Sequence, residues 1–157
     1  MSLTLSFIGY STFLGLMYFA LNSIAYRWKL LAAVYATRQW PNSPNGTKYM
    51  QAVILFGGAA FWRSYAGITT IAVTDDGIWL KLLPPFSLFH KPLMLPFSDL
   101  KVQDVEWYLN ATSVELIAEQ ASEIRIVITG DLLDWITENV PDWRLQTRRW
   151  RAMGEGD

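Results

Sequence analysis

The sequence has no cysteine and only one histidine, His90. Without cysteine there is no disulfide bond, no thiolate nucleophile and no cysteine-ligated metal. A single histidine also excludes a multi-histidine metal site. Gly-rich phosphate loops, zinc-ligand spacings and nucleophile elbows are missing as well. We therefore expect a protein that is not an enzyme and that holds no metal and no cofactor.

Charged residues are scarce too, at 17% of the 157 residues against about 25% in an average soluble domain. Residues 2–26 have none and are mostly Leu, Ile, Phe, Met, Tyr and Ala. An apolar helix of about 20 residues is long enough to cross a bilayer. The segment lacks the basic start and the cleavage site of a secretory signal. The sequence therefore predicts a retained transmembrane helix over residues 1–26, with a long buried core helix as the alternative.

Acidic residues are absent before Asp75, whereas basic residues begin directly after the apolar segment, at Arg27, Lys29 and Arg38. Basic residues next to a membrane span favour the cytoplasmic side. The pattern predicts a single-pass protein of the bacterial inner (cytoplasmic) membrane whose C-terminal domain is cytoplasmic.

The residues after the apolar segment have helical periodicity, with Trp28, Leu31, Ala32 and Tyr35 on one face. A loop rich in Pro and Asn follows, up to Thr47. We expect residues 27–47 to form a juxtamembrane amphipathic helix and a linker. The helix either packs on the following domain or lies on anionic lipid.

Residues 48–141 read as a domain of short strands that ends in a helix. Residues 49–62 suggest two strands that meet at Gly57 and Gly58, or a segment that dips into the bilayer. Residues 68–74 and 77–83 predict a hairpin that turns at 75–77. Strands are expected at 103–109, 112–118 and 124–129, and an amphipathic helix from Asp131 to Val140.

Two stretches carry a resemblance: ITTIAVTDDGIWL from Ile68, and LPFSDLK from Leu95. They resemble bacterial pleckstrin-homology-like (PH-like) domains over about residues 49–140, including small bacterial proteins in which a hydrophobic helix precedes such a domain. The resemblance implies an α+β fold: one N-terminal transmembrane helix, then a PH-like antiparallel β-barrel or sandwich of about seven strands, capped by a C-terminal helix. It implies no lipid-headgroup site, because the turn at Phe56 is uncharged and the turn at Asp75 is acidic.

Residues 84–96 are unusually apolar for a loop and contain four prolines. Exposed apolar loops often mark a contact surface. The candidate contact residues are Phe86, Leu88, Phe89 and His90. The alternative is that the ends of this stretch are strand residues packed in the core.

The tail, residues 142–157, interleaves Trp and Arg, a pattern that suits an anionic membrane surface. A solvated end is the alternative, and the tail is too short and its domain too acidic for nucleic acid. The candidate membrane-surface residues are Arg27, Trp28, Lys29, Arg38, Arg144, Arg148, Arg149, Trp150 and Arg151.

The function that these patterns predict is a membrane-anchored interaction module. It would contact lipid through the N-terminal helix and present a cytoplasmic β-barrel to a membrane-protein partner, with no small-molecule substrate. The alternatives are a peripheral binder of anionic lipid and a small accessory subunit of a larger membrane complex.

Overall fold

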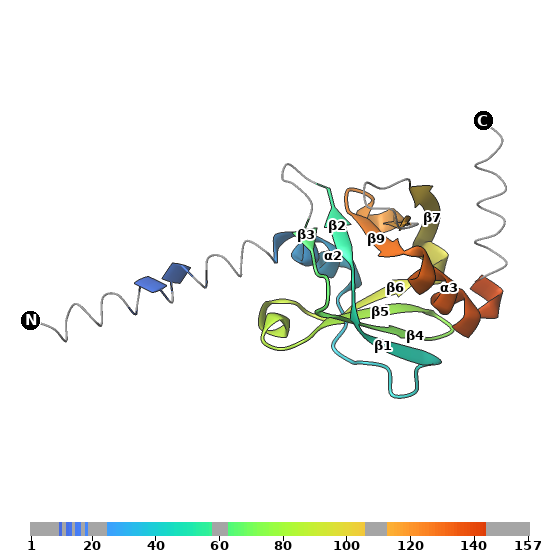
Figure 1. Ribbon diagram of the computed structural model, residues 1–157, viewed down its shortest axis with the longest axis horizontal. Coiled ribbons are helices and arrows are strands. Elements are labelled where there is room, and N and C mark those ends of the chain that lie inside the picture. Colours follow the sequence, from blue (N-terminus) through green and yellow to red (C-terminus); the bar gives the residue numbers. More distant parts are fainter. Residues whose placement is uncertain are drawn as a thin grey trace, which may run out of the picture.

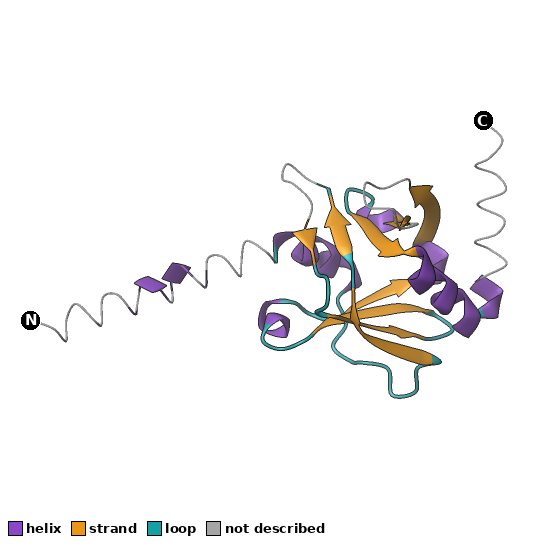
Figure 2. Ribbon diagram, viewed as in Figure 1, coloured by secondary structure: helices purple, strands orange, loops and turns teal. Residues whose placement is uncertain are grey.

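The computed structural model describes residues 10, 12–13, 15–16, 18, 25–57, 63–105 and 113–143. Within these ranges the strands form two antiparallel sheets, with helix α2 (Tyr26–Tyr35) before them and helix α3 (Gly130–Asn139) after them (Figures 1 and 2). Three short 3-10 helices connect strands: η1 (Phe86–Phe89), η2 (Phe97–Asp99) and η3 (Glu119–Ala121).

The four-stranded sheet has the order β1-β4-β5-β6, and the five-stranded sheet the order β3-β2-β9-β8-β7. The strands of the first sheet are β1 (Gly46–Gln51), β4 (Thr69–Val73), β5 (Gly77–Leu82) and β6 (Leu93–Pro96). Those of the second are β2 (Ile54–Phe56), β3 (Arg63–Ser64), β7 (Leu100–Val105), β8 (Ser113–Ala118) and β9 (Arg125–Thr129).

The two sheets share one hydrophobic core. Strand β5 shows the alternation that builds it, because Ile78, Leu80 and Leu82 are buried while Trp79 and Lys81 stay half-buried on the other face. The same core receives inward side chains of β8 and β9 and the apolar face of α3, which contacts these two strands. The predicted hairpin is confirmed by the pairing of β4 with β5, and the predicted C-terminal helix by α3.

Helix α2 is part of this core. Trp28 and Leu31 are fully buried, and the Trp28 indole N–H donates a hydrogen bond to the carbonyl oxygen of Lys91 at 2.7 Å. The helix contacts β6 of one sheet and β2 of the other. After the helix, Ala36 forms an antiparallel bridge with Leu93 at the edge of β6. The apolar face of this helix therefore packs on the domain, which is one of the two roles predicted for it.

The predicted fold class needs correction. In the part of the chain that the structure describes, no helix is long and apolar enough to cross a membrane. The transmembrane helix expected over residues 1–26, and the single-pass inner-membrane localisation that depended on it, are corrected on this finding. The barrel of about seven strands is also corrected, to sheets of four and five strands.

Two ambiguous stretches are partly settled. Strand β2 pairs with β3, with Ile54 opposite Ser64, but β3 begins at Arg63, after the stretch 49–62, so the strand pair predicted within that stretch stays a prediction. The loop between them lies outside the described residues. In the apolar stretch 84–96, the C-terminal end is strand β6, whose Leu93 and Leu95 are buried.

Candidate binding groove

The contact residues predicted in the apolar stretch do not share one exposed surface. Leu88 is 77% exposed, Phe86 is half-buried against the core, and the Phe89 side chain lies outside the described residues. His90 is buried edge-on against the rings of Trp28 and Tyr65. Among the described side chains of these four, Leu88 alone is fully presented to solvent.

Burial of His90 lowers the pKa of its imidazole below the usual 6.5, an effect that the positive charge of Lys29 reinforces. The neutral ring lies with Nδ1 2.7 Å from the carbonyl oxygen of Phe86, so Nδ1 carries the proton and donates it. The Nε2 atom is buried and has no hydrogen-bond partner among the described residues. The histidine therefore acts as a neutral structural side chain that holds η1 against α2.

The predicted membrane-surface residues are also divided. Arg27 and Trp28 are buried, and the Arg27 Nε–H donates to the carbonyl oxygen of Gly57 at 2.8 Å. Lys29 and Arg38 are exposed. The residues predicted in the tail lie outside the described part of the chain: Arg144, Arg148, Arg149, Trp150 and Arg151. Two of the nine candidates are thus unavailable to a lipid surface.

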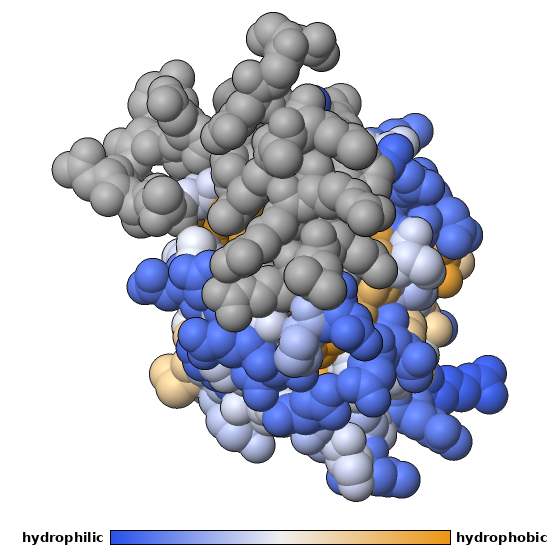
Figure 3. Space-filling model, turned by 90° about the vertical axis from the view of Figure 1, so that its right-hand side faces the viewer, coloured by the Kyte–Doolittle hydropathy of each residue, from blue (hydrophilic) through white to orange (hydrophobic). Residues whose placement is uncertain are grey.

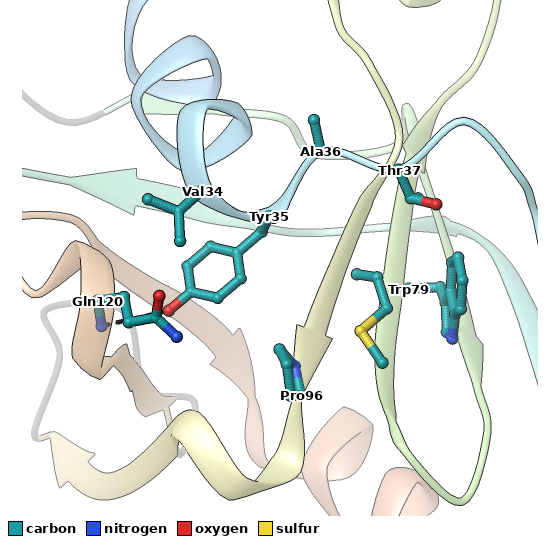
Figure 4. Close-up of a pocket in the computed structure, with 8 residues that line it drawn as sticks. Val34, Tyr35, Ala36, Thr37, Trp79, Pro96 and Gln120 are labelled. Carbon is teal, nitrogen blue, oxygen red and sulfur yellow. Dashed lines mark hydrogen bonds between the residues drawn. The ribbon is translucent and has the colours of Figure 1, made fainter.

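The surface feature that the structure adds is an open groove of about 440 Å³ between the end of α2 and strands β5 and β6 (Figure 4). We call it the α2–β6 groove. Its lining residues are Val34, Tyr35, Ala36, Thr37, Trp79, Met94, Pro96 and Gln120. Most of these side chains are apolar, and Val34 is 44% exposed. Trp79 and Met94 are cross-strand neighbours on the outer face of the four-stranded sheet.

The floor of the groove is held by Tyr35, the last residue of α2. Its hydroxyl donates a hydrogen bond to the carboxylate of Asp99 and accepts one from the backbone N–H of Gln120 at 3.3 Å. Burial raises the pKa of this phenol well above its usual 10, and the Asp99 carboxylate raises it further. Tyr35 thus stays protonated and ties α2 to η2 and η3.

One end of the groove carries two aromatic rings in edge-on contact and a positive charge. The Trp79 indole N–H donates to the Thr74 hydroxyl at 3.1 Å, which fixes the ring. The ring of Trp40 meets that of Trp79 edge-on at 6.4 Å between centroids. The Lys81 ammonium lies 5.3 Å above the Trp40 ring, in cation–π contact. An apolar groove therefore opens beside a basic rim.

The face around α3 differs from this groove. Where this face, on the right of Figure 1, is not covered by grey atoms in Figure 3, it is largely hydrophilic, with apolar residues in small separate spots. Among the described residues, no group of three acidic or histidine side chains is placed to hold a metal ion. The α2–β6 groove is thus the surface to which a binding function is best assigned.

Sequence patterns did not reveal this groove. Trp79 was visible as an outward residue of β5, and Met94 and Pro96 as parts of an apolar stretch. What places them together is the docking of α2 against β6 and η3, which joins residues 85 positions apart at Tyr35 and Gln120. No local periodicity encodes such a contact.

Comparison with known proteins adds no family. Neither a scan against protein-family models nor a search of curated proteins finds a match to this chain. The resemblance to PH-like domains therefore stays a prediction.

Proposed function

We propose that this chain is a protein-interaction module that binds an apolar segment of a partner protein in the α2–β6 groove. The observation that carries the proposal is the groove itself: apolar side chains from a helix and two strands surround an open cavity of about 440 Å³. Pockets of this size, with mostly apolar walls and few polar groups, are typical of ligand-binding sites.

The Tyr35 hydroxyl and the Trp79 indole N–H, two polar groups of the groove, are already engaged in holding it together. The Tyr35 hydroxyl is bonded to Asp99 and Gln120, and the Trp79 indole to Thr74. A group used in this way orients the walls and is not free to exchange protons with a substrate. The groove is therefore suited to contact with apolar side chains, whose burial supplies about 25 cal/mol per Å².

The partner docks through side chains and not by adding a strand. Strand β6 is at the edge of its sheet, but Ala36 already bridges it at Leu93. Farther along the strand, Pro96 has no N–H to offer to a new strand. An apolar side chain that enters between Val34, Met94 and Trp79 needs no such pairing.

The basic rim defines a second feature of the partner. Lys81 lies two residues from Trp79 on β5, so both side chains project from the same face of the strand. The exposed Arg38 follows Thr37, which lines the groove. An Asp or Glu next to the apolar anchor would complement these charges and would favour the correct orientation of the segment.

The test is selection from a displayed library of random 12-residue peptides against the full chain. We expect enriched peptides to share at least one large apolar residue followed closely by Asp or Glu. Their dissociation constants, measured by fluorescence anisotropy, should be about 10 μM, because a short segment buries only one or two anchor side chains and loses conformational freedom on binding.

Variants locate the binding site. The substitutions M94E and V34E place a charge on the groove wall and should weaken the selected peptides about tenfold or more. The matched control is M50E, on β1 at the opposite edge of the four-stranded sheet, where Met50 is 66% exposed, and it should leave affinity unchanged. Absence of enriched peptides, or peptides indifferent to both groove variants, would contradict the proposal.

The membrane-protein partner and the lipid contact predicted from sequence stay predictions. The proposal needs neither of them, because it depends only on side chains of the described groove.

A further inference from the structure

A second pocket, of about 420 Å³, lies on the outer face of the five-stranded sheet. It is formed by the end of β2, the turn before β9, and the side chains of Glu115, Glu123, Arg125 and Val127. We call it the acidic pocket, because two carboxylates face one guanidinium there. It shares no lining residue with the α2–β6 groove.

The carboxylate of Glu115 is the unusual feature of this pocket. Glu115 lies in the middle of β8, paired with Val127 on one side and Gln103 on the other, and its side chain is only 7% exposed. Buried carboxylates are normally paired and fully hydrogen-bonded, because removing their charge from water is costly. The Oε1 atom of Glu115 nevertheless accepts no hydrogen bond from the described residues.

Arg125 compensates this charge only in part. Its Nε lies 3.2 Å from Oε1 of Glu115, an ion-pair distance, but without the alignment of a hydrogen bond. The Arg125 side chain is also 64% exposed, so water screens the pair and its net contribution is small. The pocket therefore contains a buried carboxylate whose partner is loosely held and replaceable.

At one wall of the pocket, the end of β2 packs closely against the turn before β9. A Cβ atom on Gly57 would lie 1.8 Å from the carbonyl oxygen of Glu123, so only glycine allows the end of β2 to approach this turn. Gly57 has φ +121°, and its carbonyl oxygen accepts the hydrogen bond from the buried Arg27. Strand β2 and the turn therefore stay together and hold the pocket open.

We propose that the acidic pocket binds a lysine or arginine side chain of a protein partner, which takes the place of Arg125 at Glu115. The cationic group would lie between Glu115 and the exposed Glu123, with the Ser122 hydroxyl as a further acceptor. Its aliphatic stem would pack on Val127 and the half-buried Phe56. Charge complementarity selects this occupant, because the lining has one net negative charge.

A basic side chain fits better than a metal ion. Calcium and magnesium need about six oxygen ligands, whereas this pocket offers two carboxylates and has Arg125 beside them. Among the described residues, no cluster of three metal-binding side chains exists. A guanidinium or ammonium group needs only the carboxylates and the neighbouring hydroxyl.

The experiment uses capped amino acids as probes of the full chain. Nα-acetyl-arginine methylamide and the corresponding lysine derivative are titrated into ¹⁵N-labelled protein, with the norleucine derivative as the uncharged control. We expect saturable shifts in the amides of Glu115 and residues 122–125 for the two cationic probes and none for norleucine. The amide of Trp79, in the groove, should not shift, so failure here is separable from failure of the groove.

Three variants test the mechanism. E115Q keeps the shape of the side chain and should weaken the arginine probe about tenfold or more, because hydrogen bonds to a charged acceptor have that magnitude. R125Q removes the internal competitor and should strengthen binding several-fold. The matched control is E119Q, which removes an exposed carboxylate on η3 that pairs with Lys101 of β7. It should leave the affinity for the arginine probe unchanged.

E115Q is checked by thermal denaturation; if it does not fold, E123Q takes its place, and weaker binding is again expected. The proposal is overturned by the absence of saturable shifts in both the wild-type chain and R125Q. It is equally overturned if norleucine shifts the same amides, or if calcium chloride at low millimolar concentration displaces the arginine probe.

Discussion

The hydrogen bond between Tyr35 and Asp99 gives the most direct test of the fold, because one oxygen atom can be removed without changing the shape of the core. Tyr35→Phe leaves the ring in place and takes away the hydroxyl. Tyr35 is 6% exposed and Asp99 is 8% exposed, so water has little access to the site. Asp99 would then keep a buried carboxylate without this donor.

The expected loss follows from the kind of hydrogen bond. A hydrogen bond to a charged group contributes about 1.5–3 kcal/mol, and an unsatisfied buried acceptor costs a similar amount. The second bond, from the Gln120 backbone N–H at 3.3 Å, adds little because Gln120 is exposed and water can replace it. We therefore expect Tyr35→Phe to lower the free energy of unfolding by about 2–3 kcal/mol.

Urea unfolding followed by tryptophan fluorescence measures this loss, and thermal unfolding should show a Tm lower by about 4–12 °C for a chain of this size. The matched control is Tyr49→Phe, on β1, where the side chain is 65% exposed. It should change the free energy of unfolding by less than about 0.5 kcal/mol. The two variants differ only in where the lost hydroxyl lies.

A double-mutant cycle identifies the partner. When Asp99→Leu is combined with Tyr35→Phe, the double variant should lose less than the sum of the single variants, with a coupling of about 1–2 kcal/mol. The reasoning is refuted if Tyr35→Phe is no more harmful than Tyr49→Phe, or if the cycle is additive. In either case the hydroxyl would not be the link between α2 and η2.

The same pair predicts a dependence on alkaline pH. The pKa of Tyr35 is raised in the folded chain from its usual 10, by burial and then by Asp99. Above pH 10 the unfolded chain releases a proton that the folded chain retains, so the stabilisation is present below that pH and is lost as the pH rises. Wild-type stability should therefore fall more steeply than that of Tyr35→Phe above about pH 10.

Three further changes probe the packing around α2 and the acidic pocket. Wild-type stability should fall as the pH drops below about 6.5, because the unfolded chain protonates His90 before the folded chain does. The contribution of His90 to this fall is at most about 1.4 kcal/mol per pH unit. His90→Asn should reduce the slope, as measured by urea titrations at several pH values. Gly57→Ala should cost about 3 kcal/mol of stability, because its Cβ atom would clash with the Glu123 backbone. Gly67→Ala, at φ +74° with open space around it, should cost about 1 kcal/mol. Equal losses in thermal denaturation would argue against the close approach of Gly57 to Glu123. Trp28→Ala should cost about 3–5 kcal/mol by urea unfolding, and a loss under about 1 kcal/mol would be inconsistent with full burial of the indole.

Local patterns predicted the parts of the fold that local chemistry determines. The β4–β5 hairpin follows from alternating residues around a turn that ends at Gly77, where a Cβ atom would lie 2.2 Å from the carbonyl oxygen of Leu95. Helix α3 follows from the spacing of Leu132, Leu133 and Ile136, all of which are buried. In both cases the period of the apolar residues matches the period of the element.

Exposure in the apolar stretch 84–96 was harder to predict for a physical reason. Phe86, Leu88 and His90 lie within five residues, yet their environments are half-buried, exposed and buried. What decides between these environments is the distant Trp28, whose ring contacts His90 and whose indole binds the backbone of Lys91.

Helix α2 connects the two proposed sites. At its first turn, Arg27 holds the Gly57 carbonyl oxygen at the wall of the acidic pocket, and at its last residue Tyr35 forms the floor of the α2–β6 groove. The two pockets lie on different sheets, so a change in one lining, such as M94E or E115Q, should affect one binding activity. A change that loosens α2 from the core, such as Trp28→Ala, should weaken both together.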